Sequence, residues 1–341
     1  MKETRSEAAQ HFGIPELESF MKEPENCVRR YMRLIVGNSL ANTETGSIIN
    51  DAVSSSGKMI RSKLLLLCGT LGPLWEAKKE RLCALAALIE LTHLASLIHD
   101  DIVDDAPYRR GKPAIHSKYG RNAAVYAGDL LIAKVYHYQA VEQLNESGAA
   151  LSKAIERMCA GEIGQDACRY KEEVTIEEYL NNVKGKTAAL FQVACRIGAR
   201  EAGCCNEAVY KLERFGENLG IMFQLRDDLL DFTADGKAFD KEMHRDFLSG
   251  IYTMPLLKAL EHPDAHQLLR PVMRENKKRR LSTEEIADME KTVIHLGGID
   301  GTCGEIRTLA QKNEELLDTI EDNGLTAKLM KKILGLLEAG R

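Results

Sequence analysis

Two clusters of aspartates have a spacing that can place several carboxylates on one side of a helix. They are the strings DDIVDD at residues 100–105 and DDLLD at residues 227–231. Residues i and i+4 of a helix share a face, which pairs Asp100 with Asp104 and Asp227 with Asp231. Like charges at this spacing repel, and on a buried helix they need a neutralising partner. Mg²⁺ is such a partner, because it prefers oxygen ligands and commonly binds carboxylates together with phosphate oxygens and water.

The repetition of the DDxxD pattern distinguishes it from an ordinary acidic helix end. One such cluster is equally well explained as a solvated helix terminus. Two clusters far apart in the chain, each ending an apolar run, favour a shared role. If the clusters face one another, Mg²⁺ between them would hold a diphosphate from both sides.

Basic residues near both clusters supply donors for phosphate oxygens. An arginine guanidinium binds phosphate through two parallel hydrogen bonds, and a lysine acts as a point charge. The candidates are Lys58 and Arg61 in GKMIR, Arg109 and Arg110 after the first cluster, Lys186 beside Thr187, and Lys241 after the second cluster. Taken singly, each is typical of a solvated surface. Together with the carboxylates they indicate a pocket for two anionic head groups.

The elements that carry these residues are predicted to be helices. Apolar residues recur at three- and four-residue steps through residues 81–106 and 211–232. Alternating β-branched runs, which are typical of strands, are almost absent. We therefore expect an all-α fold, with a single domain of roughly a dozen helices over residues 1–341.

Turn residues indicate where some of these helices end. The strongest signals are Leu71-Gly72-Pro73, Gly111-Lys112-Pro113 and Gly297-Gly298. Ser282 and Glu285 form a capping box before a predicted helix at Glu284–Leu296. The polar stretch at residues 234–250 is predicted to be a long functional loop.

Composition argues against several other classes of protein. The 341 residues include 46 Lys and Arg and 51 Asp and Glu, and a net charge of −5 argues against binding to nucleic acid. None of the nine cysteines forms a CxxC pair, which argues against zinc ribbons and favours buried thiols in a reducing cytoplasm. The apolar run Leu82–Ile98 contains Glu90 and His93, so we interpret it as a buried helix and not as a membrane span. The polar, charged N-terminus predicts no signal peptide.

Seven strings, in their order and spacing, resemble the trans-polyprenyl diphosphate synthases, also called isoprenyl diphosphate synthases. They run from about Gly57 to Pro255 and are GKMIR, ELTHLASLIHDDIVDDAPYRRGKPAIH, AGDLLIA, GEIGQ, GKTAALF, GIMFQLRDDLLDF and DFLSGIYTMPLL. The resemblance implies an isoprenoid-synthase fold, with helices around a central cavity. It also implies a prenyltransferase that joins an allylic diphosphate, such as farnesyl or geranylgeranyl diphosphate, to isopentenyl diphosphate.

The roles of site residues carry over by position in the matching strings. The implied catalytic residues are Asp100, Asp101, Asp104, Asp227, Asp228 and Lys186. The implied ligands of Mg²⁺, with three ions expected beside the diphosphate, are Asp100, Asp104, Asp227 and Asp231. The allylic diphosphate site of the family corresponds by resemblance to Arg109, Lys186, Thr187, Gln224 and Lys241. The isopentenyl diphosphate site corresponds to Lys58, Arg61, His93 and Arg110. Glu162 and Gln165 match a polar patch of the cavity.

Three positions depart from the usual pattern of the family. Met59 and Ser62 stand where relatives usually have an arginine and a proline, which predicts a weaker or differently built isopentenyl site. Asp240 stands where a glycine usually precedes the lysine of the loop, which affects the expected closure of that loop.

Product length is predicted from the residues one turn before Asp100. Ala95 and Ser96 stand there, and both are small. In the family, an aromatic residue at such a position forms the floor of the tunnel that holds the growing chain. The resemblance therefore implies an open tunnel and a medium- or long-chain all-trans polyprenyl diphosphate. A short-chain product of 15 to 20 carbons is the alternative.

Two other functions fit the sequence less well. A class I terpene cyclase shares the first aspartate motif, but its second motif normally carries an Asn/Ser/Glu pattern, which residues 227–231 do not. Glu90 and His93 have the Glu-x-x-His spacing of di-iron bundles, but no second such pair is present. The family implies a homodimer. Since both aspartate motifs are intact, the chain could also be the catalytic subunit of a heteromeric synthase.

Overall fold

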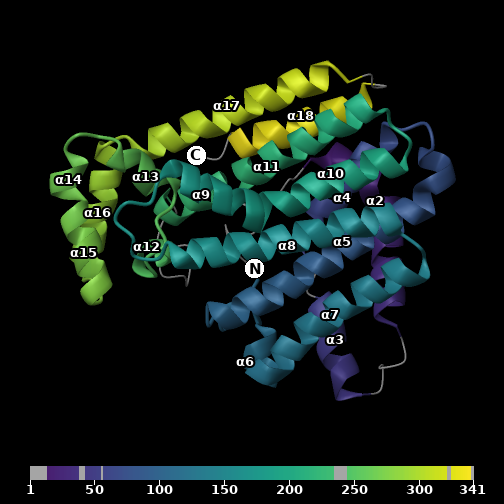
Figure 1. Ribbon diagram of the computed structural model, residues 1–341, viewed down its shortest axis with the longest axis horizontal. Helices are drawn as coiled ribbons and strands as arrows, with labels where there is room; N and C mark the ends of the chain where they lie inside the picture. The colour runs from purple at the N-terminus through teal and green to yellow at the C-terminus, as the bar shows by residue number, and fades with distance from the viewer. Residues whose placement is uncertain (1–13, 38–42, 55–56, 234–243, 321–323, 339–341) are drawn as a thin grey trace. The chain divides into compact units, whose positions relative to one another are not determined.

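The computed structural model describes residues 14–37, 43–54, 57–233, 244–320 and 324–338, and helices dominate it (Figure 1). The all-α fold predicted from the sequence is confirmed. Within the described residues there are seventeen α-helices and one π-helix, more than the predicted dozen. The excess arises partly from short helices, such as α12 (Arg245–Leu248), which lies inside the stretch predicted to be a loop.

The contacts within the chain divide it into two compact units. The N-terminal unit consists of Pro15–Ile155 and Val193–Glu213, and the C-terminal unit contains Glu156–Gln192 and Arg214–Arg341. The first aspartate motif belongs to the N-terminal unit and the second motif to the C-terminal unit. The single domain over residues 1–341 stays a prediction.

The N-terminal unit is built around one long apolar helix, α5. Its complete helices are α2 (Pro15–Val36), α3 (Glu44–Ser54), α4 (Ile60–Thr70), α5 (Trp75–Val103), α6 (Ile115–Tyr119) and α7 (Arg121–Val141). Helix α5 packs against α2, α4 and α7, and Figure 1 shows it running beside α7. It is long and apolar enough to cross a membrane, but 78% of its most apolar window is buried inside the protein. It is therefore the core helix that the sequence predicted.

The C-terminal unit places a cluster of shorter helices around the second motif. Its complete helical elements are α9 (Ile176–Val183), the π-helix η2 (Lys184–Ala188), α12, α13 (Met254–Leu260), α14 (Ala265–Leu268), α15 (Arg270–Lys278), α16 (Thr283–His295), α17 (Gly298–Asp318) and α18 (Leu325–Glu338). Helix α13 contacts α9, α16 and α17, and α18 lies along α17 (Figure 1). Three helices cross between the units: α8 (Asn145–Ala167), α10 (Ala189–Glu201) and α11 (Asn206–Thr233).

Most of the predicted helix ends lie where the sequence placed them. Helix α4 ends just before Leu71-Gly72-Pro73, α17 begins at Gly298, and the Ser282–Glu285 capping box starts α16. The prediction was wrong at Gly111-Lys112-Pro113, because α5 has already ended at Val103. These residues belong instead to a hairpin of β1 (Tyr108–Arg109) and β2 (Lys112–Pro113).

The cysteines agree only partly with the prediction of buried thiols. All nine are free thiols. Cys68, Cys83 and Cys195 are buried, whereas Cys159 and Cys205 are exposed.

Candidate active site

The first aspartate motif ends helix α5. The backbone N–H of Asp104 donates to the carbonyl of Asp100 over 2.8 Å, so the last helical turn holds these two residues one above the other, as the spacing predicted. Asp104 is the C-cap and its side chain is exposed, whereas Asp101 is only 4% exposed. The motif therefore presents some carboxylates to solvent and buries another.

The buried carboxylate of Asp101 is held by Arg109. The guanidinium donates from Nε to Oδ1 and Oδ2 over 2.8 Å, and a terminal nitrogen lies 2.7 Å from Oδ1. A two-residue hairpin loop brings Arg109 back to the helix: Arg110 has φ 52° and Gly111 φ 73°, the pair of positive angles that a type I′ turn requires. The guanidinium of Arg109, a predicted allylic-site residue, is therefore already bound to Asp101 by a charge-assisted interaction.

The same hairpin places Arg110 against the start of helix α4. Its guanidinium lies against Gly57, where an added Cβ atom would overlap it and push the arginine side chain aside. This contact brings Arg110 next to the GKMIR string, which contains Lys58 and Arg61. The sequence had assigned all three cations to one site.

Glu90 and His93 lie on helix α5 beside these cations. The carboxylate of Glu90 accepts the backbone N–H of Ser62 over 3.0 Å, which caps the first turn of α4. Glu90 therefore has a structural partner. Within the described residues no three His, Cys, Asp or Glu side chains are arranged to hold a metal ion, and this includes the four aspartates expected to bind Mg²⁺. Burial, together with the charges of Arg61, Arg110 and Arg109, holds the pKa of His93 well below its usual value, so its imidazole is neutral at pH 7.

The second aspartate motif buries its middle carboxylate in a different way. Asp228 is 1% exposed and accepts three neutral donors: the hydroxyl of Tyr179, the side-chain amide of Gln224 at 3.0 Å, and the backbone N–H of Met254 at 3.2 Å. Burial raises the pKa of Asp228 to about 6, although these hydrogen bonds favour its charged form.

Asp231, one turn further along α11, has an incompletely satisfied carboxylate. Among the described residues, its buried Oδ2 atom has no hydrogen-bond partner. Burial and the nearby charge of Asp246 raise its pKa to about 7. A buried, unpartnered carboxylate oxygen with a raised pKa is suited to a cation, and oxygen is the ligand that Mg²⁺ prefers. The chemistry of this donor therefore fits the expected metal.

Lys186 and Thr187 lie in the π-helix η2. One extra residue per turn is a local distortion that is frequent at functional sites. Close backbone packing between Gly161 on α8 and Gly185 on η2 brings Lys186 near the GEIGQ string. Its ammonium donates to Gln165 over 3.1 Å and lies 3.5 Å from Glu162. The hydroxyl of Thr187 donates to Gln224 over 2.8 Å, so the predicted allylic-site residues Thr187 and Gln224 are in direct contact.

The sequence profile of polyprenyl synthetases matches residues 42–289, most of the chain and both aspartate motifs. The chain belongs to the polyprenyl synthetase family. This confirms the resemblance drawn from the seven strings and makes the chain a member of an enzyme family of prenyl diphosphate synthases.

Two relatives of this polyprenyl synthetase are second components of heptaprenyl diphosphate synthases. Component 2 from Geobacillus stearothermophilus is 37% identical over 208 residues, covering 61% of this chain and 64% of the relative, just under two thirds. Component 2 from Bacillus subtilis is 35% identical over 271 residues, covering 79% of this chain and 75% of the relative. The crystal structure of a geranylgeranyl pyrophosphate synthase from Lactobacillus brevis has a TM-score of 0.81 at 29% identity, covering 95% of this chain and 97% of that one.

The predicted site residues of this family member fall into two sets. Within the N-terminal unit, Gly57 joins Arg110 to the GKMIR string, while Arg109 joins the hairpin to Asp101. Within the C-terminal unit, the set is Glu162, Gln165, Lys186, Thr187, Gln224, Asp227, Asp228 and Asp231. Lys241 and Asp240 lie outside the described residues. Since the two motifs belong to different units, their joint use stays a prediction.

Sequence reasoning missed one polar residue of the second set, Tyr179. It lies on helix α9 in a capping-box context, Thr175 to Glu178, that marks a helix start and gives no sign of chemistry. Only the folded chain brings its hydroxyl to Asp228. The contact of the Met254 backbone N–H with Asp228 could not be predicted from the sequence either, although the preceding Thr253 and following Pro255 do indicate a helix start.

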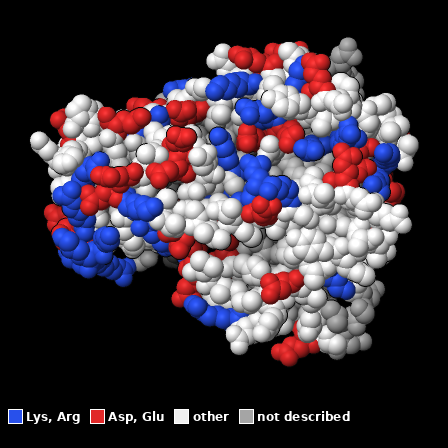
Figure 2. All heavy atoms as spheres, viewed as in Figure 1, with Lys and Arg blue, Asp and Glu red and all other residues white. Residues whose placement is uncertain are grey.

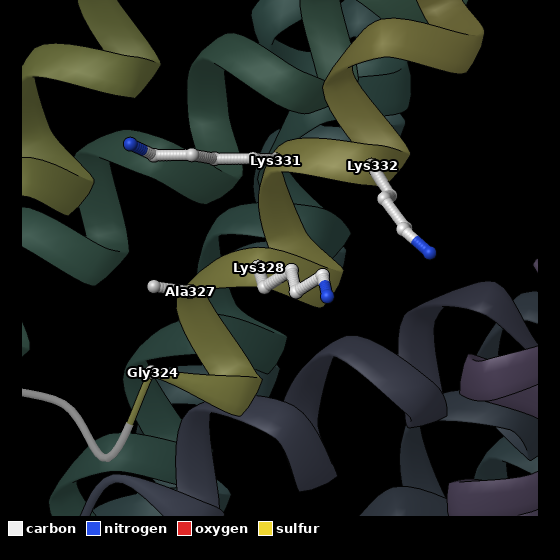
Figure 3. Close-up of a pocket in the computed structure, with 5 residues that line it drawn as sticks. All are labelled: Gly324, Ala327, Lys328, Lys331 and Lys332. Carbon is white, nitrogen blue, oxygen red and sulfur yellow. The ribbon is translucent and has the colours of Figure 1, made fainter.

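Two other clusters of charge are part of the surface of this synthetase. An open pocket on α18 is lined by Gly324, Ala327, Lys328, Lys331 and Lys332, but its three lysines point in different directions, and none of the predicted site residues lines it (Figure 3).

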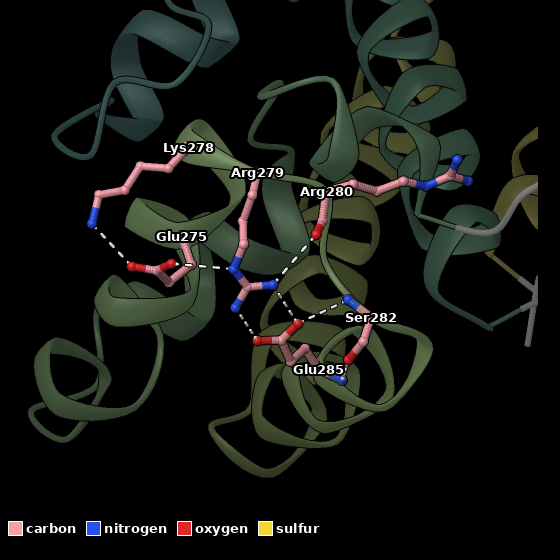
Figure 4. Close-up of polar contacts among 6 residues, drawn as sticks. All are labelled: Glu275, Lys278, Arg279, Arg280, Ser282 and Glu285. Atoms are coloured by element: carbon pink, nitrogen blue, oxygen red, sulfur yellow. Dashed lines mark hydrogen bonds and ion pairs between the residues drawn. The ribbon is translucent and has the colours of Figure 1, made fainter.

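Cations also gather over α15 (Figure 2). There Arg279 is paired with Glu275 and Glu285, and Lys278 with Glu275, so the cluster joins the end of α15 to the cap of α16 (Figure 4). We assign it a structural role.

Proposed function

We propose that this chain condenses an allylic diphosphate with isopentenyl diphosphate and makes a medium- or long-chain all-trans polyprenyl diphosphate. Family membership supports the class of reaction. The observation that carries the proposal is the repeated DDxxD motif: in each copy the second aspartate is buried and held by fixed donors.

We further propose that Mg²⁺ is held by Asp100, Asp104, Asp227 and Asp231. The unpartnered oxygen of Asp231 supports this assignment in the second motif. When bound, Mg²⁺ supplies positive charge that stabilises the diphosphate as it leaves. Asp101 and Asp228 are buried and hydrogen-bonded within the chain, so their proposed role is to orient the neighbouring carboxylates.

The basic and polar side chains divide between two diphosphates. Arg109, Lys186, Thr187, Gln224 and Lys241 are proposed to bind the allylic diphosphate. Lys58, Arg61, His93 and Arg110 are proposed to bind isopentenyl diphosphate. His93 would act as a neutral hydrogen-bond donor, because burial among arginines keeps it unprotonated at pH 7.

The proposed reaction begins when the allylic C–O bond breaks and the diphosphate takes the electron pair. Lys186 and Arg109, as fixed charges, favour this separation of charge. The double bond of isopentenyl diphosphate then forms the new C–C bond with the allylic cation. A proton is lost from the resulting cation to regenerate a double bond, and the released diphosphate is a suitable acceptor. Exclusion of water protects the cation.

The small size of Ala95 and Ser96 supports the proposed product length, whereas the full burial of Ala95 shows no open space beside it. Ala95 is fully buried on α5, and the hydroxyl of Ser96 donates to the carbonyl of His93 over 2.9 Å. Neither side chain is large enough to form a floor. Ala95→Phe is therefore expected to shorten the product, measured by chromatographic sizing. An unchanged product would mean that another helix sets the length.

We propose a homodimer, with a catalytic subunit of a heteromer as the second candidate. Exposed apolar side chains on α7 support the homodimer: Tyr126 is 71%, Val141 60% and Tyr136 41% exposed. The names of the two heptaprenyl relatives, each a second component, favour the heteromer. No helix other than α5, a core helix, qualifies as a membrane span within the described residues, and we propose a cytoplasmic enzyme.

One assay tests the function and separates these assemblies. The purified chain is incubated with Mg²⁺, farnesyl diphosphate and radiolabelled isopentenyl diphosphate, while gel filtration measures its size. We expect a dimer and a product longer than the primer. A chain that turns over only after a second component is added would establish the heteromer. Lack of turnover under both conditions would contradict the proposed reaction.

A further inference from the structure

The carboxylate of Asp228 is the meeting point of three elements of the C-terminal unit. Tyr179 reaches it from α9, Gln224 lies one turn earlier on α11, and the backbone N–H of Met254 begins α13. We propose that Tyr179 is a positioning residue: through Asp228 it fixes Gln224 and Thr187 in the orientation that binds the allylic diphosphate. This inference rests on the proposed function and adds a residue to it.

The hydrogen bonds run in one direction from the π-helix to Asp228. The hydroxyl of Thr187 donates to the oxygen of the Gln224 side chain, and the nitrogen of the same amide donates to Asp228. The Gln224 amide is thus oriented by a donor on one side and an acceptor on the other. If Asp228 rotates, the amide loses the acceptor that sets its orientation.

Asp228 needs Tyr179 because, among the described residues, only the backbone N–H of Met254 donates to the same carboxylate oxygen. The hydroxyl and this N–H both donate to Oδ2, whereas Gln224 donates to Oδ1. Tyr179 is buried, at 7% exposure, and burial together with the charge of Asp228 raises its pKa well above the usual value. The hydroxyl therefore keeps its proton and donates at every working pH. A phenylalanine at this position would preserve the ring and remove the donor.

The chain offers a matched control in the same unit. Tyr252 is buried, at 4% exposure, and its hydroxyl has no hydrogen-bond partner in the part of the chain that the structure describes. It packs against Phe247 with the ring centroids 5.8 Å apart. Tyr252→Phe thus removes a buried hydroxyl from a similar environment without removing a hydrogen bond.

The test compares Tyr179→Phe, Tyr252→Phe and the unsubstituted chain. Calorimetry measures the binding of inorganic pyrophosphate in the presence of Mg²⁺, and steady-state kinetics measure the KM of each substrate. A lost hydrogen bond to a charged group corresponds to roughly a tenfold effect or more. We expect Tyr179→Phe to weaken pyrophosphate binding and raise the allylic KM by about that factor, with less than about a twofold change in the isopentenyl KM. For Tyr252→Phe, the pyrophosphate affinity and both KM values should stay within about twofold of those of the unsubstituted chain.

The outcomes separate this inference from the proposed function. If the unsubstituted chain binds no pyrophosphate with Mg²⁺, the proposed function fails and this inference falls with it. If it binds, but both tyrosine variants behave alike, only the role of Tyr179 is overturned. An equal rise in both KM values, with a lower thermal midpoint, would show a general packing role and would also overturn it.

A double-substitution cycle tests whether Tyr179 acts through Asp228. In the Asp228→Ala background, Tyr179→Phe should weaken pyrophosphate binding no further, because the acceptor of its hydroxyl is gone. Additive effects would contradict the inference. Circular dichroism establishes that each variant is folded, and if Asp228→Ala is not, the cycle is repeated with Gln224→Leu, where the effects should again be less than additive.

Discussion

The two aspartate motifs bury the same middle position, but they satisfy it with different partners. Asp101 is held by the guanidinium of Arg109, a fixed cation on a hairpin. Asp228 is held by a hydroxyl, an amide and a backbone N–H, all neutral. The first motif therefore balances one of its charges internally. Among the described residues, the buried aspartate of the second motif has no such cation, so this motif gains more from a proton or a bound metal ion.

The largest expected effect tests whether the two motifs contribute equally to catalysis. Asp104→Ala and Asp231→Ala remove the fifth residue of each DDxxD pattern. Each is expected to lower kcat by about 10² to 10³, the usual effect of removing one electrostatic contributor. Turnover under saturating substrates and Mg²⁺ measures this. If a variant keeps full activity, the motif that it alters has only a structural role.

The next effect concerns stability and sharpens the contrast between charged and neutral partners. Arg109→Leu leaves Asp101 buried without its cation and is expected to cost about 3 kcal/mol of unfolding free energy. Gln224→Leu removes one of three neutral donors from Asp228 and should cost about 1 to 2 kcal/mol. Urea unfolding of both variants measures the difference. Equal losses would mean that the guanidinium contributes no more than a neutral donor.

The last effect is a dependence of stability on pH that comes from the second motif. The folded-state pKa values of Asp228 and Asp231 are raised from 3.8 to about 6 and about 7. Between these limits the folded chain holds more protons than the unfolded chain, so metal-free stability falls as pH rises from about 4 to 8. Between pH 5.5 and pH 8.0 we expect a loss on the order of 3 kcal/mol.

Thermal unfolding in a chelator at pH 5.5 and pH 8.0 measures this dependence. Mg²⁺ with pyrophosphate should stabilise the chain more at pH 8.0, because its ligands must be deprotonated. Asp231→Asn should weaken the dependence on pH. A metal-free chain that is more stable at pH 8.0 than at pH 5.5 would contradict the raised pKa values.

The sequence predicted the fold where its patterns are local. The three- and four-residue periodicity of residues 81–106 predicted the core helix α5, and Ser282 with Glu285 predicted the start of α16. The hairpin at Tyr108–Pro113 was missed because its turn uses Arg110 with a positive φ, where glycine or asparagine would have given a signal. The short helix α12 was missed because four residues carry too little periodicity.

The site was predictable in its residue types but not in its contacts. The motifs identified Asp101 and Asp228 without showing that both are buried. The pairing of Arg109 with Asp101 depends on the hairpin, and that of Tyr179 with Asp228 joins positions 49 apart in sequence. Such pairs depend on how the helices pack, which no local pattern encodes.

The most direct test of the central claim asks whether both motifs bind one diphosphate through metal. Calorimetry should measure pyrophosphate binding with Mg²⁺ and with a chelator, for the unsubstituted chain, Asp104→Ala and Asp231→Ala. The account predicts one site per chain that disappears in the chelator and is weakened by either substitution. Binding that persists in the chelator, or that is unchanged by one of the substitutions, would contradict it.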